Sequence, residues 1–285
     1  MTNVRPNLII IGATKCGTSS LHRYLQVHPE IFMSTPKELR FFTKNWKKGI
    51  EWYESKFDSV RPVRGESSPQ YTLYPRHADV PMRMHSVVPD ARLIYLVRDP
   101  IDRVVSHYME RLGQLREHRE LPAILADLES SRHAQNQYVN PSKYWLQIER
   151  YLKFYPPDRI LVASLEELRK RRREMLRRSF RFLGVDENFE DDAFHKVWNE
   201  SQSKRRKSWL GNLIYPARLH RAMHRHDVPR PIVTRYQALV RAAGIPVEKP
   251  KLPADLEARL VECFRQDVSR LRAFTGERFP EWREY

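Results

Sequence analysis

Short hydrophobic runs alternate with helical patterns over the first 110 residues of the chain. The region contains three candidate buried strands, 7–11 (NLIII), 62–68 (PVRGESS) and 92–99 (RLIYLVRD). Between the first two, Leu21, Tyr24, Leu25 and His28 recur on one face of a helix predicted over 19–28. Strands separated by helices predict a parallel sheet that helices cover on both faces.

The pattern continues beyond residue 99 with two further helices and a strand. One helix is predicted to begin at Pro100, with Asp99 as its cap. A strand over 159–164 (RILVAS) is then followed by one long helix over 165–184, which Gly184 ends. We therefore expect ligands at the carboxyl ends of the parallel strands, where this class of sheet binds them.

The chain shows no internal repeat, low-complexity tract or obvious linker. From about residue 200 the pattern becomes helical and more basic. The sequence therefore predicts a single α/β domain over 1–285. Its core covers about 7–210, and a helical, basic C-terminal portion covers about 211–285.

The amino-acid composition indicates the class of protein and the compartment in which we expect it. Among 285 residues, 41% are hydrophobic and 30% are charged, which is usual for a soluble globular protein. The two cysteines form no C-x-x-C pair, so neither a disulfide framework nor a zinc site is predicted. The run LIII near the N-terminus is too short to span a membrane, and we expect a cytoplasmic protein.

The net charge of +16 favours anionic partners: a multiply charged nucleotide, an acidic glycan, nucleic acid or an anionic membrane surface. Charge alone does not choose among them.

The segment after the first strand, GATKCGTSS, resembles a phosphate-binding loop with a displaced lysine. Gly12 and Gly17 have the spacing of G-x-x-x-x-G-K-[ST], but Thr18 follows Gly17, and the lysine, Lys15, lies inside the loop. Loop amides and the N-terminus of the next helix would converge on one anion. A lysine in this place suits a single phosphate bearing a transferable group. An ordinary strand-to-helix turn is the alternative interpretation.

A second anion site is predicted where the strand 92–99 ends. Arg98 projects from the carboxyl end of this strand, and Ser106 lies two turns along the following helix. A guanidinium group and a hydroxyl can bind a second phosphate. Alone, these residues would be read as an ion-pair partner and an ordinary helix residue; together with the loop they predict a two-phosphate nucleotide site.

Four segments in order resemble the sulfotransferases that use 3′-phosphoadenosine 5′-phosphosulfate (PAPS), especially the heparan sulfate and bacterial branch. They are IIIGATKCGTSSL, PKELRFF, GESSPQY and LVRDPIDRVVSHY. The resemblance covers about 7–184 and more weakly extends to about 210. It implies a P-loop-like three-layer fold, PAPS as co-substrate, adenosine 3′,5′-bisphosphate (PAP) as product, no required metal, and a hydroxyl acceptor (or an amine) on a glycan, glycolipid or metabolite.

The resemblance also implies roles for individual residues. The catalytic residues would be Lys15 and the base Glu38 of PKELRFF, whose alternative is an ion pair with Lys37 or Arg40. The residues implied in nucleotide binding are Thr14, Lys15, Cys16, Gly17, Thr18 and Ser19 at the 5′ end, Arg98 and Ser106 at the 3′-phosphate, and Lys204, Arg205 and Arg206 in a covering loop.

One position departs from the family pattern. Glycan sulfotransferases commonly have a lysine directly after the glutamate of the GESSP element, and this chain has Ser67 there. The preceding Glu66 is open to an orienting role or a purely structural one. His107 competes with Glu38 as base, although it lies outside the family's histidine position and packing is its simpler interpretation.

Two rival functions remain open at this stage. A P-loop kinase would explain the loop, but the G-K-[ST] lysine is missing. A nucleic-acid-binding protein would explain the charge, but no recognition motif is present, so nucleic acid is not an expected partner. The basic segment 209–226 either packs over the active site or lies on a membrane surface.

Overall fold

The structure is a computed structural model that describes residues 4–57, 60–114, 116–126, 128, 135–196, 205–206, 245–246 and 249–285. Five parallel strands form its central sheet in the order β2-β3-β1-β4-β5. Their bounds are β1 Leu8–Gly12, β2 Ile31–Met33, β3 Val63–Ser67, β4 Arg92–Val97 and β5 Ile160–Ser164. The predicted α/β class with a parallel sheet is confirmed.

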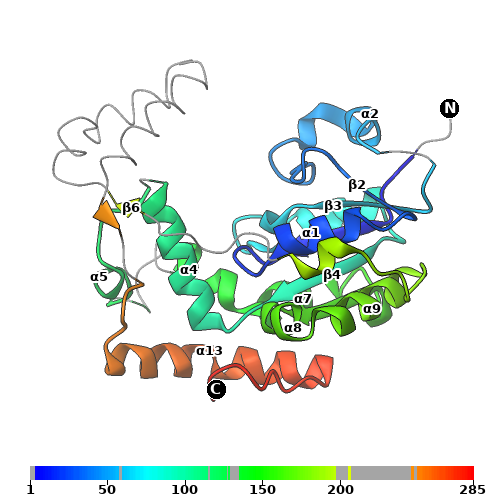
Figure 1. The fold of residues 1–285 in the computed structure, drawn as a ribbon. Helices are drawn as coiled ribbons and strands as arrows, with labels where there is room; N and C mark the ends of the chain where they lie inside the picture. Colours follow the sequence, from blue (N-terminus) through cyan, green and yellow to red (C-terminus); the bar gives the residue numbers. More distant parts are fainter. Residues whose placement is uncertain are drawn as a thin grey trace.

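Helices flank this sheet and connect its strands (Figure 1). The α-helices are α1 Thr18–Gln26, α2 Gly49–Glu54, α3 Val80–Val87, α4 Pro100–Gly113, α5 Leu121–Leu125, α7 Tyr144–Tyr151, α8 Leu165–Lys170, α9 Arg172–Leu183 and α13 Ala254–Thr275. Short 3-10 or π turns lie at η1 Trp46–Lys48, η2 Pro69–Thr72, η3 Gln135–Val139, η4 Asn140–Ser142, η5 Pro157–Arg159 and η6 Asp192–His195.

The central strand β1 lies between β3 and β4, and its five residues are all buried. The strands that follow β1 in the chain lie on both sides of it, β2 and β3 on one side and β4 on the other, and sheets of this class bind ligands at the carboxyl end of such a strand. The loop that follows Gly12 occupies this position. A Cβ atom at Gly12 would lie 2.0 Å from the Thr72 hydroxyl oxygen, so the close approach of β1 to η2 requires glycine here.

One predicted helix is wrong in its extent. The segment 165–184 forms two helices, α8 and α9, because Arg171 leaves helical geometry with φ −128° and ψ 46°. Gly184 ends α9 in the left-handed conformation, as predicted. Asp99 caps α4 by accepting a hydrogen bond from the backbone N–H of Asp102 at 2.9 Å, also as predicted.

The C-terminal portion packs onto the core. Helix α13 lies against α7 and α4, along the bottom of Figure 1. Asp267 of α13 accepts hydrogen bonds from the backbone N–H groups of Trp145 and Leu146, at the start of α7, at 3.0 and 2.8 Å. The final segment then returns to the start of α4, where Arg283 pairs with Asp99 at 2.5 Å.

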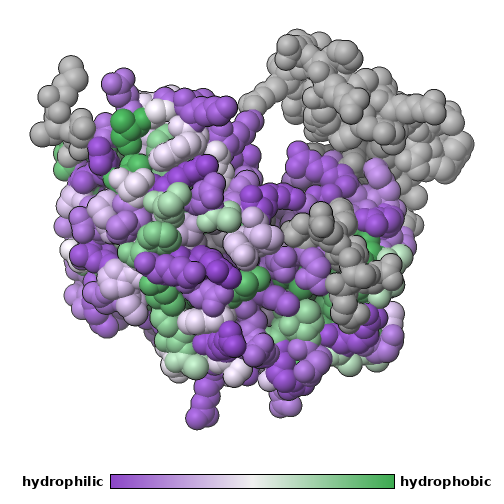
Figure 2. Space-filling model, turned by 180° about the vertical axis from the view of Figure 1, so that it is seen from behind, coloured by the Kyte–Doolittle hydropathy of each residue, from purple (hydrophilic) through white to green (hydrophobic). Residues whose placement is uncertain are grey.

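Hydrophilic residues dominate the face shown in Figure 2, and hydrophobic ones are scattered among them. Within the described ranges, Val60 and Met82 are the large hydrophobic residues that are exposed. No helix in the described part of the chain is long and apolar enough to cross a membrane.

Candidate active site

The loop between β1 and α1 has the geometry of an anion-binding turn. Gly17 adopts a left-handed conformation with φ 90°, and a Cβ atom there would lie 2.7 Å from the Leu165 side chain. Gly17 is the N-cap of α1 and, having no side chain, leaves the first N–H groups of the helix without a side-chain cap. The hydroxyls of Thr18 and Ser19 begin this helix. The loop therefore presents amides, hydroxyls and the positive end of a helix dipole together.

Lys15 adopts a left-handed conformation with φ 74° in this loop. Its ammonium lies 3.2 Å from Glu110 Oε1, on α4. The side chain of Lys15 is only 20% exposed. The predicted cation is thus at the loop, and in this structure a carboxylate of α4 neutralises it.

Lys37 is a second cation at the loop, and sequence reasoning missed this placement. Its ammonium donates hydrogen bonds to Ser19 Oγ at 2.9 Å and Thr18 Oγ1 at 3.2 Å. Burial lowers the pKa of Lys37. Its position beside Glu38 in PKELRFF was the available signal, but we had considered Lys37 only as an ion-pair partner.

Glu38 lies beside this cation. Its carboxylate is 3.6 Å from the Lys37 ammonium and accepts hydrogen bonds from Arg40 Nη2 at 2.6 Å and Nε at 3.0 Å. The ion pairs that we had considered as its alternative role are therefore present. These ion pairs also hold the carboxylate beside Lys37, whose ammonium contacts the hydroxyls of Thr18 and Ser19.

Glu66 anchors the segment that carries this carboxylate. It is fully buried and accepts hydrogen bonds from Tyr53 at 2.7 Å, Tyr71 at 2.8 Å and Ser68 at 2.6 Å. Burial raises the pKa of Glu66. Ser68 Oγ in turn accepts the backbone N–H of Arg40 at 3.0 Å. Glu66 therefore positions the chain next to Glu38, which favours the orienting role.

Ser67, which stands where a lysine was expected, is fully buried, and its hydroxyl has no hydrogen-bond partner in the described part of the chain. Its backbone N–H donates to the carbonyl oxygen of Lys37 at 3.1 Å. Ser67, which lacks the ammonium group, is therefore joined by a backbone hydrogen bond to Lys37, which carries one.

The second predicted anion site lies at the start of α4. Arg98 Nη2 is 3.3 Å from Asp102 Oδ2, and Ser106, half-buried, lies one turn further along the helix. Two cations that we had not predicted join them, since Lys249 and Arg283 lie 3.3 and 3.4 Å from Asp102 Oδ1. Although burial opposes it, these three cations lower the pKa of Asp102.

The remaining predicted nucleotide contacts fall in or near undescribed parts of the chain. Lys204 and the segment 209–226 lie outside the described residues. The backbone of Arg205–Arg206 forms strand β6, which pairs with β7 (Ile245–Pro246) and lies beside α4. Their side chains are also outside the described part.

Two polar side chains of the loop have structural contacts. Thr14 donates its hydroxyl to the Pro69 carbonyl oxygen at 3.3 Å. Cys16 is fully buried with its sulfur 3.6 Å from the Tyr144 hydroxyl, and burial raises the pKa of its thiol to about 11. Its side chain therefore faces the core, and any contribution of Cys16 to binding comes from the backbone.

His107 also serves packing. Its ring lies against Tyr138, and its Nδ1 is 3.3 Å from Arg103 Nη1. Burial, with the charges of Arg103 and Arg111, holds the pKa of His107 well below its usual range. In the described ranges, no three His, Cys, Asp or Glu residues are grouped as metal ligands.

Comparisons with known proteins identify the family of the chain. Residues 5–224 match the family model described as Sulfotransferase domain. The chain is 28% identical over 199 residues, 63% of its length, to the bifunctional heparan sulfate N-deacetylase/N-sulfotransferase 2 of Bos taurus, and covers 22% of that protein. It is 35% identical over 122 residues to the membrane-associated sulfotransferase kil1 of Dictyostelium discoideum, covering 41% of this chain and 25% of the relative.

A solved structure extends the similarity to nearly the whole chain. The crystal structure of a sulfotransferase from Alicyclobacillus acidocaldarius superposes with a TM-score of 0.67 at 27% identity, covering 99% of this chain and 100% of the other. The curated relatives are much longer, and the chain spans about a quarter or less of their length.

Proposed function

Because this chain belongs to the sulfotransferase family of enzymes, we propose that it transfers the sulfuryl group of PAPS to a hydroxyl or amine of an acceptor. The observation that carries the proposal is the presence of two cation-lined sites at the carboxyl ends of neighbouring strands β1 and β4. A nucleotide with phosphates at both its 5′ and 3′ positions matches such a pair of sites.

In this proposal the 5′-phosphosulfate lies on the loop after β1. The amides at the start of α1 and the hydroxyls of Thr18 and Ser19 hold it. Lys15 and Lys37 supply two ammonium groups at the loop. On binding, Lys15 exchanges Glu110 for the ligand. Arg98 and Ser106 hold the 3′-phosphate beside α4, with Lys249 and Arg283 close by.

The transfer is an in-line displacement at sulfur. The acceptor oxygen or nitrogen forms a bond to sulfur, while the bond between sulfur and the bridging oxygen of the 5′-phosphate breaks. The electron pair of that bond stays on the phosphate oxygen, which leaves as PAP. Fixed ammonium groups at this oxygen stabilise the transition state more than the ground state. Glu38 accepts the proton of the acceptor.

In this proposal Lys37 supplies the positive charge that the family's lysine, replaced here by Ser67, would otherwise provide. Its ammonium lies at the loop hydroxyls and 3.6 Å from Glu38. It is therefore near both the transferred group and the base. The buried Ser67 beside it leaves room for this arrangement without a second positive charge.

For the acceptor, we propose a glycan. The relatives named as bifunctional heparan sulfate N-deacetylase/N-sulfotransferases support this class. A glycolipid or a small metabolite carries the same hydroxyl chemistry.

The test is binding and turnover of the purified chain with nucleotides. We expect PAP to bind in the presence of EDTA, and ³⁵S-labelled PAPS to label a glycan fraction. Lys15→Ala should abolish the labelling. A kinase would instead bind ATP with Mg²⁺ and hydrolyse or transfer its γ-phosphate. Failure to bind PAP, or phosphoryl transfer from ATP, would overturn the proposal.

A further inference from the structure

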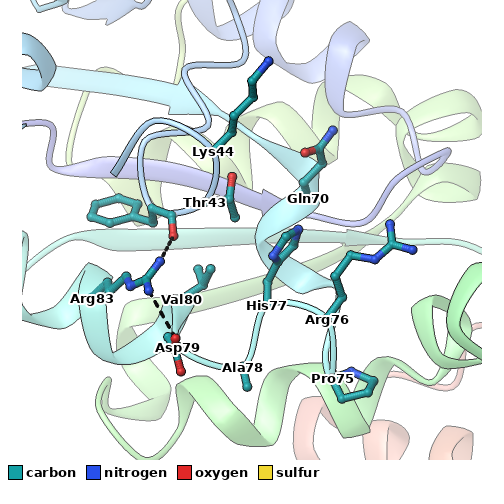
Figure 3. Close-up of a pocket in the computed structure, with 11 residues that line it drawn as sticks. Thr43, Lys44, Gln70, Pro75, Arg76, His77, Ala78, Asp79, Val80 and Arg83 are labelled. Carbon is teal, nitrogen blue, oxygen red and sulfur yellow. Dashed lines mark hydrogen bonds and ion pairs between the residues drawn. The ribbon is translucent and has the colours of Figure 1, made fainter. Parts of the chain in front are cut away.

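An open cavity of about 400 Å³ lies beside the candidate active site (Figure 3). Its walls are the turn at 42–44 and the segment 70–83, which includes the start of α3. These walls follow β2 and β3, two neighbouring strands, so the cavity opens at the same edge of the sheet as the phosphate loop. The polar and charged residues that line it are Thr43, Lys44, Gln70, Arg76, His77, Asp79 and Arg83.

Arg83 holds the two walls together. Its Nη1 donates to the carbonyl oxygen of Phe42 at 3.3 Å, and its Nη2 pairs with Asp79 at 3.2 Å, as the dashed lines in Figure 3 show. Its guanidinium also lies 5.4 Å from the centre of the Trp46 ring. The contacts of Arg83 thus maintain the shape of the cavity.

Lys44 and Arg76 do not join the cavity walls in this way. Both side chains are exposed, and neither pairs with a carboxylate among the residues that the structure describes. In Figure 3 they extend toward the same side of the cavity, with the amide of Gln70 between them. His77 also lines the cavity, and burial, with the charges of Arg76 and Arg83, lowers the pKa of its imidazole. Two exposed cations and an amide thus line the same cavity.

The cavity walls connect directly to the reaction site. Thr43 donates its hydroxyl to the carbonyl oxygen of Arg40 at 3.2 Å, and Arg40 holds Glu38. On the other wall, the residue before Gln70 accepts the hydroxyl of Thr14, in the phosphate loop. A molecule bound across the cavity would therefore lie next to the base and the donor loop.

We propose that this cavity binds an anionic group of the acceptor, a carboxylate or a sulfate ester. Lys44 and Arg76 pair with the negative charge, and Gln70 hydrogen-bonds to a neighbouring hydroxyl. The proposal rests on the sulfotransferase function proposed above and narrows its acceptor class to acidic molecules, of which acidic oligosaccharides are the class tested here.

The probe is a size-defined heparin octasaccharide, titrated calorimetrically into the full chain saturated with PAP. We compare Lys44→Gln/Arg76→Gln with the wild type and with Lys153→Gln/Arg270→Gln. The control pair removes two exposed cations on other surfaces and leaves the same net charge. We expect at least tenfold weaker octasaccharide binding in the cavity variant and less than a twofold change in the control.

Three outcomes would overturn the assignment. They are equal weakening in the two double variants, equal wild-type affinity for a desulfated and carboxyl-reduced octasaccharide, and no octasaccharide binding by the wild type. PAP affinity and melting temperature are measured for each variant and should not change. If PAP itself fails to bind the wild type, the proposed function fails; if PAP binds and the cavity variant behaves like its control, only the cavity assignment fails.

Discussion

Lys37 and Ser67 show how one side chain changes the meaning of a motif. The segment PKELRFF was read for its glutamate, and the lysine before it turned out to contact Thr18 and Ser19. Spacing along the chain could not show this, because the ammonium lies at the end of a long side chain whose direction is fixed by packing around it. The sequence shows that Ser67 replaces the family's lysine, but it does not show that the ammonium of Lys37 lies at the same loop.

Lys37→Ala tests this compensation. We expect kcat to fall by about 10²–10³, the loss found when one fixed donor to a developing charge is removed. Lys47→Ala, which removes an exposed cation nearby, should leave kcat unchanged. Adding Ser67→Lys to the Lys37→Ala variant should restore at least tenfold of the lost rate. Wild-type kcat in Lys37→Ala would exclude Lys37 from the reaction.

Glu38→Gln separates catalysis from binding at the neighbouring residue. Without a carboxylate to accept the acceptor's proton, kcat should fall by about 10²–10⁴. PAP affinity, measured by calorimetry, should stay within twofold, since Glu38 holds no part of the nucleotide. Glu51→Gln, an exposed carboxylate change, serves as the control. An unchanged kcat would assign the proton transfer to another group.

Glu110→Gln tests whether Lys15 must leave a partner before it binds the nucleotide. The Lys15–Glu110 pair is partly exposed, and pairs of this kind contribute up to about 1 kcal/mol. Removing the competing carboxylate should therefore tighten PAP binding by about two- to fivefold. The control is Glu149→Gln, on α7. Weaker PAP binding in Glu110→Gln would mean that Glu110 orients Lys15 for the ligand.

Among the elements, the sequence predicted best those with the strongest local pattern. β1, β4 and β5 are mostly apolar, buried runs, and the capped start of α4 and the glycine end of α9 have local chemical causes. The break at Arg171 was missed because neither proline nor glycine marks it. Lys249 and Arg283 were missed because they reach Asp102 from more than 140 positions away in the sequence.

The contact between α13 and α7 predicts a pH dependence of stability. Burial raises the pKa of Asp267 to about 6, whereas an exposed aspartate titrates near 4. Between about pH 4 and pH 6 the folded protein therefore holds a proton that the unfolded chain has lost. The stabilisation from this residue is complete below pH 4 and is lost as the pH rises to 6, by roughly 3 kcal/mol.

Asp267→Asn removes this titration. Urea unfolding at pH 4, 5, 6 and 7 should show the largest loss of stability relative to the wild type at pH 4, and a smaller loss at pH 6. Glu262→Gln, an exposed change on the same helix, corrects for general titration. A difference between Asp267→Asn and wild type that is constant with pH would contradict the raised pKa.

At the scale of the whole molecule, the last residues of the chain contact the start of α4, where the second anion site is predicted. Arg283 contacts Asp99, Asp102 and Glu257, and thereby joins the start of α4 to the start of α13. Trp282 donates its indole N–H to Glu166 at 3.1 Å, which adds the start of α8. The C-terminal portion thus supports the start of α4, where the second anion site is predicted.

Arg283→Gln should therefore change both stability and nucleotide affinity. It leaves the buried Asp99 without its cationic partner, which costs roughly 2 kcal/mol of unfolding free energy for a pair that is only partly exposed. PAP binding should weaken several-fold because α4 loses an anchor at its start. Arg278→Gln, an exposed arginine in the same segment, is the matched control. Unchanged PAP affinity in a destabilised Arg283→Gln would limit its role to folding.

The carboxylates that pair with Lys15 and Arg98 have a consequence for the release of the product nucleotide. If the nucleotide binds as proposed, Glu110 and Asp102 pair again with Lys15 and Arg98 when the desulfated nucleotide departs. The two ion pairs that re-form offset part of the cost of pulling a multiply charged molecule out of a basic crevice. A strongly positive protein can in this way release its spent co-substrate instead of being trapped by it.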